Sequence, residues 1–317
     1  MIKMYKKTAK HAIRDGFSLA FACFHWYNET SDRKEEIPMK KALIGYQVYS
    51  AREEAAKDLR GVLKKLAELG YDGVEFAGFY GHTADEVKTM LEETGLKAIS
   101  GHQALPETID EMFATIAFYK KIGCEYLAVP YLDEAHRPGS EGFAKTLRDI
   151  YTFGKLCREA GIQLLYHNHD FEFVKISGEY GLDFIYDAVS EDILKTEVDV
   201  CWVKYAGEDP AAYVRKYTGR APIVHLKDYV GKKGGKQPYA LISKDGSGKD
   251  DGAAADPSDI AFEFRPVGYG CQDIPSVVEA GLEAGAGWFI VEQDQWYDRH
   301  PREAAKMSID YLRSIGL

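Results

Sequence analysis

Short apolar runs alternate with longer amphipathic stretches from Ala42 to the C-terminus of the chain. Runs such as IQLLYHNH (162–169) have the length and composition of buried strands. Stretches such as 51–70 repeat apolar residues every three or four positions and stop at a glycine, which is the pattern of an amphipathic helix. The alternation predicts a series of strand–helix units whose strands run parallel.

Eight such units follow one another along the chain. The expected strands lie at 42–50, 72–78, 96–102, 124–130, 162–169, 194–200, 221–228 and 288–294. The expected helices lie at 51–70, 83–95, 105–123, 141–161, 181–190, 209–219, 274–285 and 301–316, with Thr83 as a helix N-cap. Eight parallel strands that alternate with helices close naturally into an α/β barrel of the (β/α)8 or TIM type.

Two segments do not fit this alternation. Residues 1–38 have a basic start and one short apolar patch, but Arg14 and Asp15 directly precede that patch, which argues against a signal peptide. We therefore expect an N-terminal extension at 1–38 and the barrel domain at 39–317. After the seventh strand, residues 231–259 are rich in Gly, Lys, Asp and Ser, which is typical of a long mobile loop. We expect this loop to cover the site or to contact another subunit of a homo-oligomer.

Composition narrows the range of partners. The formal net charge is −10, and the acidic residues are spread along the chain. Nucleic-acid binding depends on clustered Lys and Arg, so this charge argues against a nucleic-acid partner. No apolar run approaches the ~18 residues of a membrane-spanning helix, so we expect no membrane partner. Five cysteines, far apart and without a C-x-x-C motif, favour reduced thiols in a cytoplasmic protein.

Polar residues gather where the predicted strands end, which is the face that carries the site in such barrels. Strands five to eight end in His167, Asp199, His225 and Glu292, and two imidazoles with two carboxylates match the shell of a divalent metal ion. His169 shares a strand face with His167, so either could be the strand-five ligand. Each residue alone has a plainer explanation, as a hydrogen-bonded rim histidine, a helix cap or a partner of a lysine. The joint pattern favours the metal site, because unpaired buried carboxylates are costly.

Two residues near these strand ends could act on a substrate. Lys227 lies two positions after His225, points to the same strand face and could stabilise an oxyanion. Alternatively, Lys227 forms a salt bridge with Asp228 or Asp199. Trp202 could form an apolar wall for a sugar ring or could simply pack in the core.

Three further residues are candidates for substrate binding. Arg265 follows the long loop and could bind a phosphate or a carboxylate, or could pair with Glu263 on the surface. His102, at the end of strand three, could contact a substrate hydroxyl. Glu75, at the end of strand two, could orient a base or a substrate hydroxyl.

Six runs carry a family resemblance: LAELGYDGVEFAG, GIQLLYHNHDFEF, EVDVCWVKYAG, IVHLKDY, FRPVGYGCQDIP and WFIVEQDQ. From about Ala42 to its C-terminus the chain resembles the xylose isomerase-like barrels, in particular the sugar phosphate isomerase/epimerase group. The resemblance implies an enzyme that holds one divalent metal ion (Mn²⁺, Co²⁺, Mg²⁺ or Zn²⁺) and acts on a small sugar or keto-sugar. The usual ligands of the family are Glu, Asp, His and Glu. Asp199, His225 and Glu292 match three of them, and His167 stands in place of the first glutamate.

The resemblance implies an isomerase or epimerase that removes a proton next to a carbonyl and passes through an enediolate. Glu292 and either His167 or His169 would then move protons, and Lys227 would stabilise the oxyanion. Because such epimerases use two glutamates, the histidine on strand five leaves a second reaction open, a metal-dependent dehydratase or lyase acting on a keto-sugar or inosose-like ring. The net charge argues against an endonuclease-type relative, and a non-catalytic sugar-binding protein would need no metal shell.

A chain that begins at Met39 should fold with an unchanged thermal midpoint, because residues 1–38 precede the first strand and carry no expected site residue. Thermal unfolding of the full and the shortened chain, followed by circular dichroism, measures this. Loss of solubility or a large drop in the midpoint would show instead that the extension packs on the barrel or forms an interface.

Overall fold

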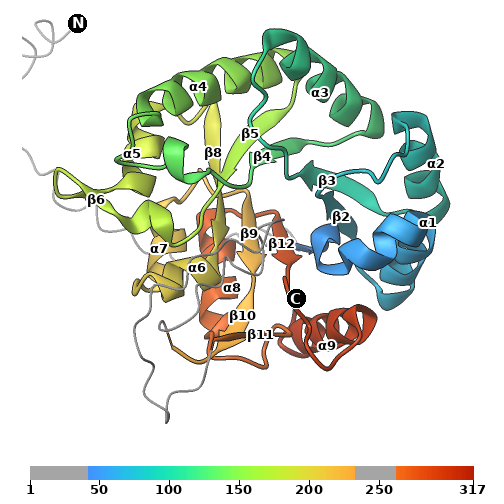
Figure 1. Ribbon diagram of the computed structural model, residues 1–317. Coiled ribbons are helices and arrows are strands. Elements are labelled where there is room, and N and C mark those ends of the chain that lie inside the picture. The colour runs from blue at the N-terminus through green and yellow to red at the C-terminus, as the bar shows by residue number, and fades with distance from the viewer. Residues whose placement is uncertain (1–41, 233–261) are drawn as a thin grey trace, which may run out of the picture. The chain divides into compact units, whose positions relative to one another are not determined.

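The computed structural model of the protein describes residues 42–232 and 262–317. The expected extension at 1–38 lies outside these residues, as does all but the first two residues of the expected loop at 231–259. Both therefore stay predictions. In the described part, strands occupy the centre of the barrel and helices surround them (Figure 1).

Eight parallel strands form the central sheet, as the sequence predicts. They are β1 (Leu43–Gln47), β2 (Gly73–Phe76), β3 (Lys97–Gly101), β4 (Tyr126–Val129), β5 (Gln163–His167), β8 (Leu194–Asp199), β9 (Ile223–Leu226) and β12 (Trp288–Val291). Their order is β3-β2-β1-β12-β9-β8-β5-β4. A parallel bridge between His102 and Ala128 links the end of β3 to β4. The sheet thus curls into a nearly closed barrel, and the predicted TIM fold is confirmed.

Helices follow the strands in the predicted alternation. They are α1 (Arg52–Leu69), α2 (Ala84–Thr94), α3 (Ile109–Ile122), α4 (Phe143–Ala160), α5 (Gly181–Ala188), α7 (Pro210–Lys216), α8 (Ile274–Ala284) and α9 (Pro301–Ser314). Thr83 caps α2 as predicted. Its hydroxyl accepts a hydrogen bond from the backbone of Glu86, and the Glu86 carboxylate accepts one from the backbone of Thr83. Gly70 ends α1 with a φ of 91°, a conformation that side chains disfavour.

Several short elements were not expected from the sequence. They are helix α6 (Val200–Tyr205), the hairpin of β6 (Lys175–Ile176) and β7 (Glu179–Tyr180), the antiparallel pair β10 (Asp228–Val230) and β11 (Glu263–Arg265), and 3₁₀ turns at Val48–Ala51, Glu134–His136 and Phe171–Phe173. Helix α6 begins directly after β8 because the Asp199 carboxylate accepts hydrogen bonds from the backbone of Cys201 and Trp202. The other elements are too short to produce a periodic pattern in the sequence.

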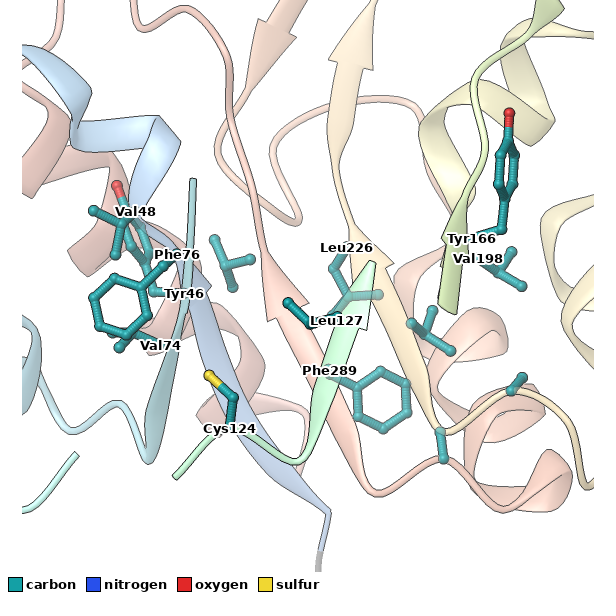
Figure 2. Packing of buried hydrophobic residues seen from close by; sticks show 14 of the residues in the cluster. Tyr46, Val48, Val74, Phe76, Cys124, Leu127, Tyr166, Val198, Leu226 and Phe289 are labelled. Carbon is teal, nitrogen blue, oxygen red and sulfur yellow. The ribbon is translucent and has the colours of Figure 1, made fainter. Parts of the chain in front are cut away.

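The apolar core has two layers, one on each face of the strands. The larger cluster fills the space between strands and helices, and Figure 2 shows members such as Phe76, Leu226 and Phe289. The smaller cluster fills the barrel interior and consists of Ile99, Ala128, Leu165, Ile223, Trp288 and Ile290. Since side chains alternate along a strand, the residues two positions further along β5, β9 and β12 also point inward. These residues are His167, His225 and Glu292, so the polar cluster lies on an apolar floor.

Within residues 42–232 and 262–317, no helix is long and apolar enough to cross a membrane. The four cysteines in this part of the chain are free thiols. Cys124, Cys157 and Cys201 are buried, and Cys271 is exposed.

Candidate functional site

A cavity of about 510 Å³ opens at the C-terminal ends of the strands. Its size is in the range of small-molecule pockets, and it lies on the face where TIM barrels carry their sites. Five predicted site residues line it, namely His102, His167, His169, Lys227 and Glu292. Other residues in its lining include Asp294, Tyr49 and Tyr131.

The four expected metal ligands lie together beside this cavity. One ligand atom from each of His167, Asp199, His225 and Glu292 lies within 4.8 Å of the others. All four residues are buried. They come from four neighbouring strands of the barrel, and Asp199 and His225 are register partners. Parallel strands bring their carboxyl ends to one edge, which is why polar residues far apart in the sequence converge here.

Each of the two imidazoles faces one of the two carboxylates. His167 Nε2 lies 3.6 Å from Asp199 Oδ2. His225 Nδ1 lies 2.9 Å from Glu292 Oε2. Asp199 uses its other oxygen, Oδ1, to cap α6, which leaves Oδ2 for the site.

A second pair of carboxylates, Glu75 and Glu197, is fully buried next to the histidines. His102 Nε2 lies 3.0 Å from Glu75 Oε2 and 2.7 Å from Glu197 Oε1. The Glu75 carboxylate also accepts hydrogen bonds from the side chains of Gln47 and Ser100. Glu75 therefore contacts the histidines and does not line the cavity in the described structure.

Sequence reasoning missed Glu197 as a site residue. It precedes Asp199 by two positions on β8, so both side chains point to the same face. Glu197 lies inside the apolar run 194–200 rather than at its end, so it was not among the expected site residues. With His102, His167 and His225, Glu197 forms a second set of ligand atoms that lie within 4.8 Å of one another.

Lys227 is buried among three carboxylates. Its Nζ lies 3.2 Å from Asp199 Oδ2, 3.0 Å from Glu292 Oε2 and 3.1 Å from Asp294 Oδ2. Of the two salt-bridge partners considered from the sequence, Asp199 is found. The Asp228 carboxylate instead accepts hydrogen bonds from four backbone amides. Asp294 is a further cavity residue that the sequence did not single out.

His169 lines the cavity, and Trp202 packs against the His169 ring without lining the cavity in the described structure. The two rings stack with centroids 5.1 Å apart, and Trp202 is fully buried. Lys227 Nζ lies 5.3 Å from the centroid of the Trp202 ring, at the distance of a cation–π contact. The backbone amide of His169 donates a hydrogen bond of 2.8 Å to the carboxylate of Glu172, which fixes the chain beyond β5.

Arg265 does not line the cavity among the described residues. Its guanidinium pairs with Glu263 on β11, the alternative partner considered from the sequence. The structure therefore leaves Arg265 outside the cluster that the other candidates form.

Burial and neighbouring charges shift the pKa values of the three imidazoles in different directions. Burial opposes a positive charge on His102, but the carboxylates of Glu75 and Glu197 outweigh burial and raise its pKa to about 10. Burial also disfavours the charged form of His225, yet the same two carboxylates hold its pKa well above the usual value. Burial, together with His102 and His225, holds the pKa of His167 well below the usual value. His167 is therefore the neutral imidazole of the cluster.

The two acids beside Lys227 differ as well. Burial disfavours the charged form of Glu292, but Lys227 and His225 hold its pKa below the usual value. Burial raises the pKa of Asp294 to about 7, although Lys227 opposes the shift. Glu292 is therefore a carboxylate at neutral pH, whereas Asp294 titrates near neutrality.

The donor set fits a divalent cation. In the described part of the chain Lys227 is the only buried lysine or arginine, and it is outnumbered by the buried acids Glu75, Glu197, Asp199, Glu292 and Asp294. Asp199 Oδ2 faces His167 and forms no hydrogen bond among the described residues, although Lys227 Nζ lies 3.2 Å from it. The one ammonium group of Lys227 is shared among Asp199, Glu292 and Asp294, so a further cation beside Asp199 would lower the cost of burying these acids. Imidazole and carboxylate together suit Mn²⁺, Co²⁺ and Zn²⁺, and carboxylates suit Mg²⁺.

Comparisons with known proteins agree with this fold. A search of curated proteins gave no match. A solved sugar phosphate isomerase/epimerase from Parabacteroides distasonis is 21% identical with a TM-score of 0.67, over 86% of this chain and 98% of that one. D-allulose 3-epimerase from Methylomonas sp. is 15% identical with a TM-score of 0.61, over 87% of this chain and 98% of that one. The probable 3-DHS dehydratase AsbF from Bacillus anthracis is 11% identical with a TM-score of 0.65, over 86% and 98%.

A family model also matches the sequence directly. The model of the xylose isomerase-like TIM barrel matches residues 63–315. This span runs from within α1 to the end of α9 and includes every candidate site residue. The chain therefore belongs to the family of xylose isomerase-like TIM barrels.

Proposed function

We propose that the protein is a metal-dependent isomerase or epimerase that acts on a small sugar or keto-sugar. The observation that carries the proposal is the convergence of His167, Asp199, His225 and Glu292 beside a cavity of about 510 Å³. The sugar phosphate isomerase/epimerase and the D-allulose 3-epimerase of the same fold support the choice of reaction class.

In this proposal the same four residues hold the ion. When bound, a divalent ion is a Lewis acid that polarises a substrate carbonyl and lowers the free energy of an enediolate by several kcal/mol. The side chains around the cavity bind the substrate and move the proton.

Glu292 is the proposed base. Its carboxylate lines the cavity and is ionised at neutral pH, so it can take a proton from the carbon next to the carbonyl. Lys227 Nζ lies 3.0 Å from Glu292, lines the same cavity and can donate a hydrogen bond to the developing oxyanion. A second acid/base group is needed when the proton returns to the opposite face of the carbon. His167 and His169 both line the cavity, and His169 is the group available when His167 is held as a ligand.

A dehydratase or lyase acting on a keto-sugar or inosose-like ring is the second candidate. The observation that favours it is the imidazole of His167 at the place of a second glutamate, which leaves Glu292 as the carboxylate base. An elimination needs one base and one acid that protonates the leaving group. Asp294 lines the cavity and has a pKa of about 7, so it can supply that proton near neutral pH. The probable dehydratase AsbF has the same fold.

Incubation of the metal-loaded protein with a panel of keto-sugars in D₂O separates these functions. An isomerase or epimerase should give an isomer of the substrate in which deuterium has replaced a hydrogen next to the carbonyl. A lyase should release water or another β-substituent. Mass spectrometry and proton NMR detect both outcomes, and the Glu292→Gln variant should give neither. Deuterium uptake at an equal rate after a chelator has removed the metal would contradict the metal dependence.

Substitution of His167 by alanine should remove most bound metal and nearly all turnover, because His167 directly follows the apolar part of β5 and faces Asp199. The matched variant His169→Ala should keep the metal and lose turnover by about 10²-fold or more if His169 moves a proton. Inductively coupled plasma mass spectrometry of both variants measures the metal content. Full occupancy in His167→Ala would reject this assignment, and the reverse pattern would transfer the ligand role to His169.

Metal affinity should increase with pH between about pH 6 and pH 8. In the metal-free protein the pKa of His225 is raised, so His225 carries a proton at neutral pH that an incoming ion has to displace. One displaced proton changes the apparent affinity by up to about tenfold per pH unit. His167 has a lowered pKa and contributes no such competition in this range. Titrations with a chelating indicator, corrected for its own protonation, measure the slope, and a flat profile would contradict the role of His225.

A further inference from the structure

Glu197 contacts both proposed histidine ligands from the side opposite to the carboxylate ligands. His167 Nδ1 lies 3.1 Å from Glu197 Oε1. His225 Nε2 lies 3.1 Å from the same oxygen and 2.9 Å from Glu75 Oε2, so it points between two carboxylates. Glu197 is fully buried and is not part of the described cavity lining. One carboxylate oxygen thus holds two rings that come from two different strands.

These contacts determine which nitrogen of His167 can bind a cation. A carboxylate only accepts hydrogen bonds, and a neutral imidazole carries one N–H and one lone pair. His167 Nδ1, which is hydrogen-bonded to Glu197, therefore keeps the hydrogen, and the lone pair lies on Nε2, which faces Asp199. His225 faces carboxylates with both ring nitrogens, Nε2 towards Glu75 and Glu197 and Nδ1 towards Glu292, so its contacts do not select one tautomer.

We propose that Glu197 is a positioning residue that fixes the tautomer and orientation of His167, so that an ion binds at His167 Nε2. This inference rests on the proposed metal site and deepens it. It also rejects a second ion position among His102, His167, Glu197 and His225, although their ligand atoms lie as close together as those of the first set.

Two observations favour the set with Asp199 and Glu292 over the set with Glu197. A catalytic ion needs a coordination position that the substrate can reach. His167 and Glu292 line the cavity, whereas Glu197 does not, among the residues that the structure describes. In addition, Glu197 Oε1 already lies 2.7 to 3.1 Å from nitrogens of three imidazoles.

The same contacts give a reason for the histidine on β5. A glutamate at position 167 would bring a second carboxylate against Glu197, and two buried carboxylates side by side repel each other. An imidazole instead donates to Glu197 through Nδ1 and still offers Nε2 to a cation. His167 and Glu197 are register partners on β5 and β8, so the pairing is built into the barrel. Carboxylate partners of this kind orient metal-binding imidazoles and raise their basicity.

Nitrogen-15 NMR of the zinc-loaded full chain, with ¹⁵N-labelled histidine, tests the proposal directly. Each imidazole nitrogen gives a distinct signal when it binds metal, carries a proton or has a free lone pair. We expect one zinc ion per chain, metal on His167 Nε2 and a proton on His167 Nδ1, which faces Glu197. Metal on His167 Nδ1 would overturn the proposal. A wild-type chain that takes up no ion would instead reject the proposed function itself.

A pair of variants adds a quantitative test. In Glu197→Gln a neutral amide replaces the carboxylate and accepts the His167 N–H more weakly, so zinc affinity should fall by ~10- to 100-fold and the tautomer signals of His167 should change. The control is Glu172→Gln, another fully buried glutamate, whose side chain binds Tyr166 and the backbone of His169 but no imidazole ring. Its zinc affinity and the His167 tautomer should match wild type. An unchanged His167 tautomer in Glu197→Gln would also overturn the positioning role. The NMR of the wild-type chain decides the matter should that variant fail to fold.

Discussion

Compensation of buried charge is the constraint that governs the carboxyl end of this barrel. A carboxylate that is removed from water without a partner costs several kcal/mol. Glu197 and Asp199 are both fully buried on β8, and neither has room to escape to solvent. His102 and His167 form hydrogen bonds with Glu197, and Lys227 and His225 lie within ion-pair distance of these acids, so that acidic and basic groups fix one another's positions. The cluster is therefore stable only as a whole, and its geometry follows from mutual pairing.

The two-residue period of a strand places this cluster at a fixed depth. On β9 the inward residues are Ile223 and His225, and Lys227 follows directly after the strand, so the side chains change from apolar to polar within a few residues. The same change occurs on β5 and β12 at the same level. An apolar layer below the cluster keeps water out, which strengthens the electrostatic interactions above it. The polar layer above it borders the cavity, where a substrate can reach His167 and Lys227.

Much of this arrangement could be predicted from the sequence, because repeated local signals specify it. The strand–helix alternation predicted the barrel, and the Thr83 cap and the Gly70 stop followed from local rules. The candidate ligands were found because each ends an apolar run. Glu197 was missed because it lies inside such a run, where a polar residue gives no boundary signal. The full set of Lys227 partners could not be predicted, because Asp199, Glu292 and Asp294 are far from Lys227 in the sequence and only the barrel's closure brings them together.

Asp199 divides its two oxygens between architecture and site. Oδ1 accepts hydrogen bonds from the first turn of α6, while Oδ2 faces His167 and Lys227. A ligand tied down in this way can offer a cation a single oxygen, which leaves more of the coordination sphere to small molecules. Helix α6 also carries Trp202, whose ring stacks on His169 at the cavity wall. The first turn of α6 thus joins the ring that packs on His169 to the carboxylate of Asp199, so the cavity wall and the acid share one short piece of backbone.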